Sequence, residues 1–323
     1  MSIKLDWLPG DPQITSYKVY RSEDRFKPDV LPAAYATLPA SAVSFEDTNV
    51  AIGKLYYYRV SGIKGGKELV SFIKPMAYVP DRGPGPKEIL RGDWEWGYFG
   101  TLNQGEFGSP ADVLFEMKRN GLTVKYWSPS TPAGENEYWC KFASKGRVVY
   151  IYAFAFGDNP TWKTLYDAGI AGGGTPADQI PEVVKTAYGT VTKDFRIFMR
   201  DKQFRIRLPE SRNKWTDTLD SDLWQETGSR RAGEFDHLFM AIWGTDYDGY
   251  QDKPPFLGRE TPGFSGSSGI LCKEMYAADP SKVILRQAIG SGNFLGYMQS
   301  VSATVFPNLW GGCFQPVIEL IQE

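Results

Sequence analysis

The hydrophobic pattern is most continuous at the end of the chain, within residues 310–321. Pro316 excludes a helix there, and the positions that follow it are β-branched or leucine with one exception. A run that is apolar on both sides of the pleat is typical of a strand covered on both faces. The pattern therefore predicts a strand after Pro316 that lies in the middle of the sheet of the largest domain.

Residues 1–80 show short alternating runs instead. Ile3, Leu5 and Trp7 alternate with Lys4 and Asp6, which puts three large apolar side chains on one face of a strand. Further strand-like runs, bounded by turn residues, occupy 17–20, 43–47, 56–62 and 69–73. This part of the chain is predicted to be a small all-β domain.

The segments LDWLPG, SYKVYRSED, FEDTNV and GKLYYYRVSGI resemble, in this order, the B, C, E and F strands of fibronectin type III domains. The resemblance implies a β-sandwich over residues 1–80. In that family another strand precedes the tryptophan strand, whereas here only Met1 and Ser2 do. We therefore expect the strand over 3–7 to lie at an edge, with unpaired N–H and C=O groups.

An open edge of this kind is normally charged, twisted or covered. Strand addition from another polypeptide or from a second copy would cover it, and the candidate interface residues are then Ile3, Lys4, Leu5, Asp6 and Trp7. The alternative is that residues 78–89 fold back as a surrogate strand.

Residues 81–92 are predicted to be a linker, because the prolines and glycines of the segment starting at Pro80 exclude a regular ladder. We expect the two halves to fold separately and proteases to cut between them. The second domain, 93–323, mixes helices with strands. Helices are predicted from Ser109, from Thr161 and over 233–243; strands are predicted over 138–143, 148–156, 283–288 and 297–305, with a hairpin around Asp201–Lys202.

The ordered segments WGYFG, WCKFASKGRVVYIYAF, TWKTLYDAG, FRIRLPESRNKW, GEFDHLFMAIW, ILRQAIGSGNFLG and WGGCFQPVIELI resemble a family of bacteriophage and prophage virion proteins. The layout RLP…EFDHL…W…FQPVIEL also resembles C-type-lectin-like folds. Together these resemblances imply a mainly β protein in which a fibronectin-like sandwich precedes a larger C-type-lectin-like α+β domain. They imply a virion structural protein, in a tail, fibre, collar or decoration role, with other virion proteins as partners and several copies in the particle.

Composition narrows the classes of function. The net charge of −2 gives no general attraction to nucleic acid, and no apolar run reaches the length of a membrane span. The N-terminus lacks the apolar core of a signal peptide, so we expect synthesis in the bacterial cytoplasm before assembly into the virion. The three cysteines, Cys140, Cys272 and Cys313, lie far apart, which favours buried thiols over a disulfide framework or a zinc site.

The sequence contains no recognisable catalytic motif. His237 is the single histidine, and its place on an amphipathic helix favours a surface or half-buried side chain over a general base. The sequence has no GxSxG motif and no Cys-His spacing, so it does not support a Ser-His-Asp or Cys-His mechanism of nucleophilic catalysis. We expect no enzymatic activity and no cofactor.

Two charged stretches are candidate functional sites, and a simpler interpretation is favoured for each. Asp246, Asp248 and Asp252 are spaced as in a calcium loop, but Leu257 stands where a bidentate glutamate would close it, so a solvated turn is favoured. Arg205, Arg207, Arg230 and Arg231 cluster in the sequence, with Asp217, Asp220 and Asp222 nearby. We interpret this cluster as mixed, solvated surface.

Aromatic residues at loop positions are the remaining candidates. The candidates are Trp215, Trp224, Tyr247 and Tyr250. Each has a flat aromatic ring and a hydrogen-bonding O–H or N–H group, which suits stacking on a sugar or contact with a protein, although burial in the core is the simpler explanation. A receptor-binding lectin that recognises host-surface glycan is therefore the alternative to a purely structural virion protein. A glycan hydrolase would need two carboxylates about 5–9 Å apart in a cleft.

Overall fold

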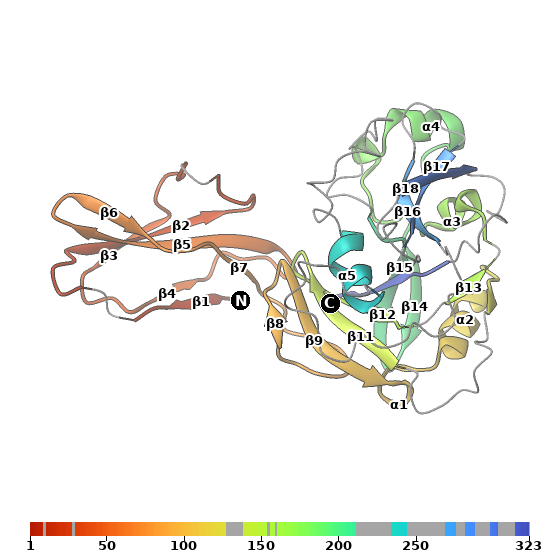
Figure 1. Ribbon diagram of the computed structural model, residues 1–323, viewed down its shortest axis with the longest axis horizontal. Helices are drawn as coiled ribbons and strands as arrows, with labels where there is room; N and C mark the ends of the chain where they lie inside the picture. The colour runs from red at the N-terminus through yellow and green to blue at the C-terminus, as the bar shows by residue number, and fades with distance from the viewer. Residues whose placement is uncertain are drawn as a thin grey trace.

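The computed structural model describes residues 1–8, 11–27, 30–126, 138–153, 156–158, 160–210, 234–243, 269–275, 282–287, 298–302 and 314–322. These residues form mainly β-sheet, with helices from residue 104 onward, which confirms the predicted class at that level. Figure 1 shows an elongated N-terminal β unit beside a larger domain that holds all the described helices. None of the described helices has the length and apolar character needed to cross a membrane.

The N-terminal unit consists of two packed sheets. β1 pairs with β4 in the first sheet, while β3, β2, β5 and β6 pair in that order in the second, where β7 also pairs with β5. The strands are β1 (Ile3–Asp6), β2 (Ser16–Ser22), β3 (Ala36–Pro39), β4 (Ser44–Asp47), β5 (Leu55–Lys64), β6 (Lys67–Val70) and β7 (Lys74–Ala77). Ile3 and Leu5 of β1 are buried against Val19, Tyr56 and Tyr58 of the second sheet, so the apolar face predicted from the alternation is the core face.

A buried carboxylate also ties the two sheets together. Asp47, in β4, accepts hydrogen bonds from the hydroxyl of Tyr58 at 2.6 Å and from Arg21 at 2.9 Å. Burial by itself would raise the pKa of Asp47, but these donors lower it below its usual value. The β1–β4 sheet is therefore held to the other sheet by polar bonds as well as by apolar packing.

The second domain is built on a seven-stranded sheet in the order β14-β15-β19-β12-β11-β9-β8. These strands are β8 (Arg91–Gly92), β9 (Trp96–Asn103), β11 (Tyr138–Ser144), β12 (Arg147–Tyr152), β14 (Phe195–Met199), β15 (Lys202–Arg207) and β19 (Val317–Leu320). The terminal strand β19 is antiparallel to both β15 and β12, and all four of its residues are buried. The prediction of a central terminal strand is confirmed, and so is the β14–β15 hairpin with its turn at Arg200 and Asp201.

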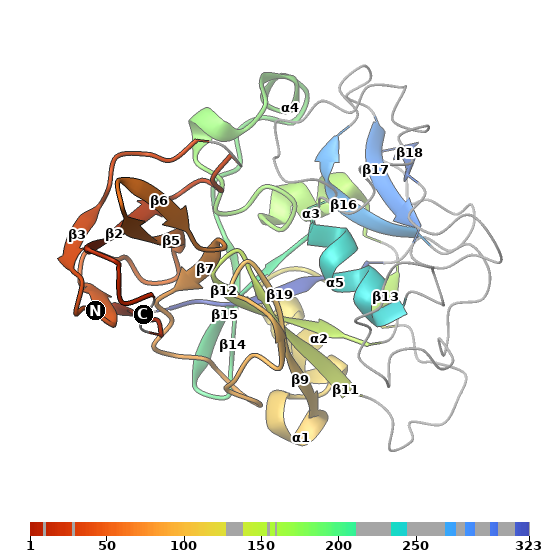
Figure 2. The same ribbon diagram turned by 60° about the vertical axis from the view of Figure 1, so that its left-hand side comes forward.

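Helices and smaller sheets surround this sheet (Figure 2). They are α1 (Gln104–Phe107), α2 (Pro110–Arg119), α3 (Trp162–Ala168), α4 (Glu182–Tyr188), α5 (Glu234–Trp243), the 3-10 turn Ala177–Gln179, the pair β10 (Lys125–Tyr126) and β13 (Gly157–Asp158), and the sheet β16 (Gly269–Met275), β17 (Lys282–Gln287) and β18 (Met298–Ser302). The predicted caps are present: Ser109 forms a capping box with Asp112, and Thr161 caps α3, which ends at a left-handed Gly169. The sequence did not indicate α4.

The segment predicted to be a linker lies against the second domain. Gly83 has a φ of +62°, and a Cβ there would lie 2.9 Å from a side-chain carbon of Leu320 in β19. The Tyr150 hydroxyl donates to the Pro84 carbonyl at 3.1 Å. Residues 91 and 92 belong to the sheet itself, as β8. The prolines and glycines therefore let the chain follow the sheet surface closely, and the segment does not pair with β1.

Candidate functional site

The open edge of β1 is the predicted interface that the structure describes in full. Within the described part of the N-terminal unit, β1 has a single hydrogen-bonded neighbour, β4. The surrogate-strand alternative is wrong for this structure, because none of residues 78–89 pairs with β1: Tyr78 forms a bridge with Ile52, and the segment around Pro84 contacts the second domain. The side chains of Lys4 and Asp6 are each more than half exposed and form an ion pair at 2.9 Å on the outer face.

The register shows which backbone groups point outward. The Trp7 N–H donates to the Val43 carbonyl at 3.0 Å, in continuation of the pairing of Leu5 with Phe45. Hydrogen-bonded and non-hydrogen-bonded pairs alternate along an antiparallel ladder, so Ile3 and Leu5 also direct their backbone groups toward β4. Lys4 and Asp6 consequently direct their N–H and C=O groups to the open edge.

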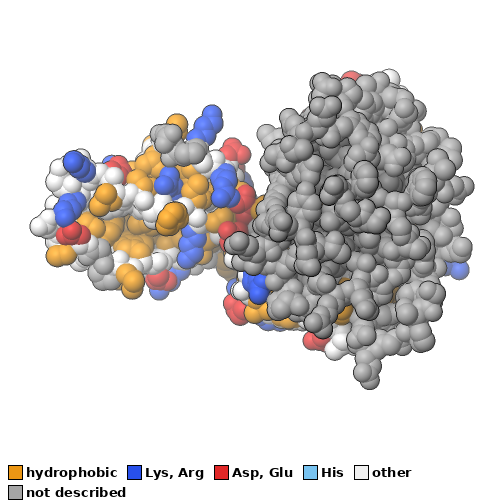
Figure 3. Space-filling view, viewed as in Figure 1, with side chains coloured by type: hydrophobic (Ala, Val, Ile, Leu, Met, Phe, Trp, Pro, Cys, Tyr) orange, Lys and Arg blue, Asp and Glu red, His pale blue; other side chains and the backbone are white. Residues whose placement is uncertain are grey.

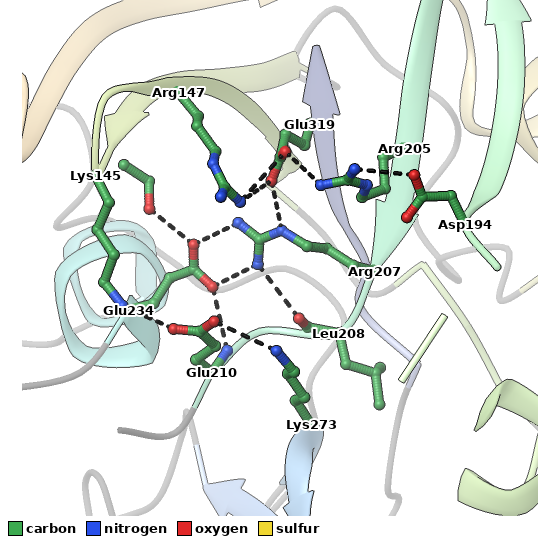
Figure 4. Close-up of polar contacts among 11 residues, drawn as sticks. Lys145, Arg147, Asp194, Arg205, Arg207, Leu208, Glu210, Glu234, Lys273 and Glu319 are labelled. Carbon is green, nitrogen blue, oxygen red and sulfur yellow. Dashed lines mark hydrogen bonds and ion pairs between the residues drawn. The ribbon is translucent and has the colours of Figure 1, made fainter. Parts of the chain in front are cut away.

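A buried ion network lies in the described part of the second domain (Figure 4). Glu319 in β19 is only 5% exposed. Its carboxylate accepts hydrogen bonds from Arg205 at 3.0 Å and from Arg207 at 2.8 Å, and Arg147 of β12 lies 3.2 Å away. Burial by itself would raise the pKa of Glu319, but the three arginines lower it to about 2.

The network continues to α5. Arg207 makes two parallel bonds to Glu234, the first residue of α5, each at 2.6 Å. Glu234 also accepts from the Ser144 hydroxyl of β11 at 2.8 Å. Burial opposes its ionisation, yet Arg207 in particular lowers the pKa of Glu234. At the rim, Glu210 pairs with Lys145 at 2.7 Å.

This geometry corrects the interpretation of the arginine cluster. Arg205 and Arg207 are not solvated surface residues, because their side chains are 20% and 12% exposed and are paired with carboxylates from elements distant in sequence. A close glycine approach completes the packing. A Cβ at Gly174, where φ is +74°, would lie 2.5 Å from a carboxylate oxygen of Asp194, which pairs with Arg205. Arg230 and Arg231, with Asp217, Asp220 and Asp222, lie outside the described residues.

The ion network has a structural role: it connects several elements of the second domain. Each carboxylate at its centre is held by arginine and kept ionised, so neither is available as a general acid, and the network joins β11, β12, β15, β19 and α5. In the described part of the chain, no group of histidine, cysteine, aspartate or glutamate side chains could hold a metal ion. One sequence signal could have revealed the network: Glu319 is a charged residue within an otherwise apolar strand.

His237 is half-buried on α5, as predicted from its helix face. Its ring stacks on Trp96 of β9, with centroids 4.4 Å apart and planes at 10°. Trp96 is thus covered by this helix. Cys140 and Cys272 are buried thiols, as predicted, and burial raises the pKa of Cys140 well above its usual range.

The predicted glycan-binding and calcium residues cannot be placed. Trp215, Trp224, Tyr247 and Tyr250 lie outside the described residues, as do Asp246, Asp248 and Asp252. Cys313 lies outside them as well.

Lys141 is a buried amine that the sequence did not single out. It lies on β11 and is fully buried, and its Nζ donates to the carbonyls of Pro84 at 2.9 Å and Pro86 at 2.5 Å. Burial is the main reason that its pKa falls to about 7, and the nearby cations Lys87 and Arg82 lower it further. Lys141 therefore fastens the segment between the two domains onto the sheet.

Replacing Lys141 with methionine is expected to release this segment. The Pro86 carbonyl would lose its donor, at a cost of about 1–3 kcal/mol if it stayed buried, and the Pro84 carbonyl would keep only the Tyr150 hydroxyl, so local opening becomes more favourable. Proteolysis within 81–92 should accelerate about tenfold or more. The exposed Lys163→Met variant is the control and should be cut like the wild type, while equal protection in Lys141→Met would contradict the tethering role.

Comparisons of the chain with protein-family models, with curated proteins and with solved structures find no match. Function is therefore inferred from the residues and geometry of the chain itself.

Proposed function

We propose that this protein is a non-enzymatic structural protein of a bacteriophage virion. It docks on a neighbouring polypeptide through its N-terminal fibronectin type III-like domain and displays the larger, C-type-lectin-like domain. The virion context is supported by the ordered segments that resemble phage structural proteins. The docking mode is supported by one observation above all, the open edge of β1.

The strand arrangement fits the fibronectin-like assignment. The segments that resemble the B, C, E and F strands correspond to β1, β2, β4 and β5, with β1 and β4 in one sheet and β2 and β5 in the other. The position beside β1, which the family's first strand would occupy, is open among the described residues. An extended segment of another chain fits this position through main-chain hydrogen bonds.

The surface of the N-terminal unit also favours a contact role. Figure 3 shows hydrophobic side chains across its visible face. Several large apolar residues of this unit are highly exposed: Leu8, Val30, Leu69 and Phe72. Exposed apolar surface typically marks a protein contact where it forms a contiguous patch. In contrast, the charges at the centre of the second domain are paired internally, which favours a rigid scaffold.

Lys4→Pro tests the docking mode. Proline removes the Lys4 N–H, which points to the open edge and is not used within the fold, so the stability of the isolated protein should change by about 1 kcal/mol or less. Incorporation into particles, measured by complementing a phage that lacks the wild-type chain, should fail.

Leu5→Pro is the matched control. The Leu5 N–H points toward β4, and its side chain is buried, so this variant should lose on the order of 3 kcal/mol and the fold of the N-terminal unit. If folded Lys4→Pro protein enters particles at the wild-type level, the β1 edge is not the docking contact.

A further inference from the structure

We infer that the β1 edge pairs with the β1 edge of a second copy of this chain, in an antiparallel two-fold contact centred on Leu5. This inference rests on the proposed docking function and names its partner. In this arrangement Lys4 lies opposite Asp6 of the second copy, and the two β1–β4 sheets join into one sheet of four strands.

Backbone geometry restricts the possible registers. Only Lys4 and Asp6 present N–H and C=O groups to the open edge, and both members of a hydrogen-bonded pair must do so. In antiparallel self-pairing within Ile3–Asp6, these two residues can therefore meet as Lys4 with Asp6, as Lys4 with Lys4, or as Asp6 with Asp6.

Charge selects among these registers. Opposite charges on directly opposed residues stabilise a strand pair, and like charges destabilise it. Only the register centred on Leu5 opposes unlike charges, and two-fold symmetry makes it do so twice. The Lys4–Asp6 ion pair within one strand shows that both side chains already lie on the same outer face, ready to form a group of four alternating charges.

The apolar face is compatible with the same register. Leu5 lies opposite Leu5 of the second copy, and Ile3 lies opposite Trp7. Since Ile3 and Leu5 are buried in their own domain, the pairing extends the covered face of the sheet without exposing new apolar surface.

The outer edge of β4 lacks this complementarity. Ser44 and Glu46 direct their backbone groups away from β1, because they are the non-hydrogen-bonded partners of Asp6 and Lys4. Self-pairing there would oppose two glutamates, two serines or a serine and a glutamate, so no register brings opposite charges together. Of the two edges of this sheet, β1 is therefore the self-complementary one.

The test is sedimentation of the full chain over concentrations up to the millimolar range. The wild type should form a weak dimer, since the contact is short. Lys4→Asp and Asp6→Lys each oppose like charges at two positions and should weaken dimerisation about tenfold or more. The double variant Lys4→Asp/Asp6→Lys restores opposite charges in the register centred on Leu5, and it should dimerise like the wild type.

Two further variants test whether the dimer forms through the β1 edge. Lys4→Pro should abolish the dimer, and Glu46→Lys, on the outer edge of β4, should leave it unchanged. A monomeric wild type, or single charge variants that dimerise normally, would overturn the inference. If the wild type is monomeric and Lys4→Pro still fails to enter particles, the docking function stands and the partner is a different virion protein.

Discussion

Deleting residues 315–323 is expected to abolish folding of the second domain. The deletion removes β19, which pairs with β15 on one side and β12 on the other, so the seven-stranded sheet would be divided in two. It also removes Gln315, whose amide bonds the Tyr152 carbonyl at 2.7 Å and the Phe156 N–H at 2.9 Å. Loss of a fully buried central strand exceeds the whole stability of a typical domain, about 5–15 kcal/mol. Expression should give insoluble protein.

A shorter deletion provides the control. Removing only residues 322 and 323 leaves β19 intact and removes the contacts of Gln322 with the backbone of Asp81. That protein should be soluble and should unfold cooperatively. A soluble, cooperatively melting 315–323 deletion would refute the central role of β19.

Replacing Glu319 with glutamine is expected to destabilise the second domain by about 3–5 kcal/mol, because removal of one partner leaves buried arginine charge uncompensated. The exposed Glu182→Gln variant should change the free energy of unfolding by about 0.5 kcal/mol or less. Denaturant titration of both variants measures the difference. Equal stability of Glu319→Gln and the wild type would show that the ion network does not stabilise the second domain.

The same substitution should change the response to acid. Burial opposes ionisation of Glu319, but the arginines lower its pKa from 4.5 unfolded to about 2 folded. Stabilisation by this carboxylate is therefore fully present above about pH 4.5 and is lost as the pH falls toward 2. Glu319→Gln lacks this titration, so its stability should fall less steeply over the same window.

The sequence predicted the elements of the fold better than their partners. β-branched and leucine residues after Pro316 identified a buried strand, and Ser109 and Thr161 identified two helix starts, since each of these signals is local. The period of two in the β15 hairpin strand showed that Arg205 and Arg207 share a face. It could not show that Glu319 and Glu234, far along the chain, cover that face, and the arginines were therefore taken for surface residues.

Lys141 and the segment 81–92 illustrate the same limit. Prolines and glycines were interpreted as a linker because they exclude a ladder, but they also allow close approach to a sheet. The buried amine that binds Pro84 and Pro86 comes from a strand with an apolar pattern, in which one lysine looks like an ordinary polar position. In contrast, the prediction that the strand over 3–7 lies at a sheet edge is confirmed, because β1 pairs only with β4 among the described residues.

The most direct test of the docking role is an image of the assembled particle at a resolution that traces strands. The protein should be found in the virion with a strand of another polypeptide hydrogen-bonded to Lys4 and Asp6 of β1. A particle in which β1 faces solvent, or one that does not contain this protein, would contradict it.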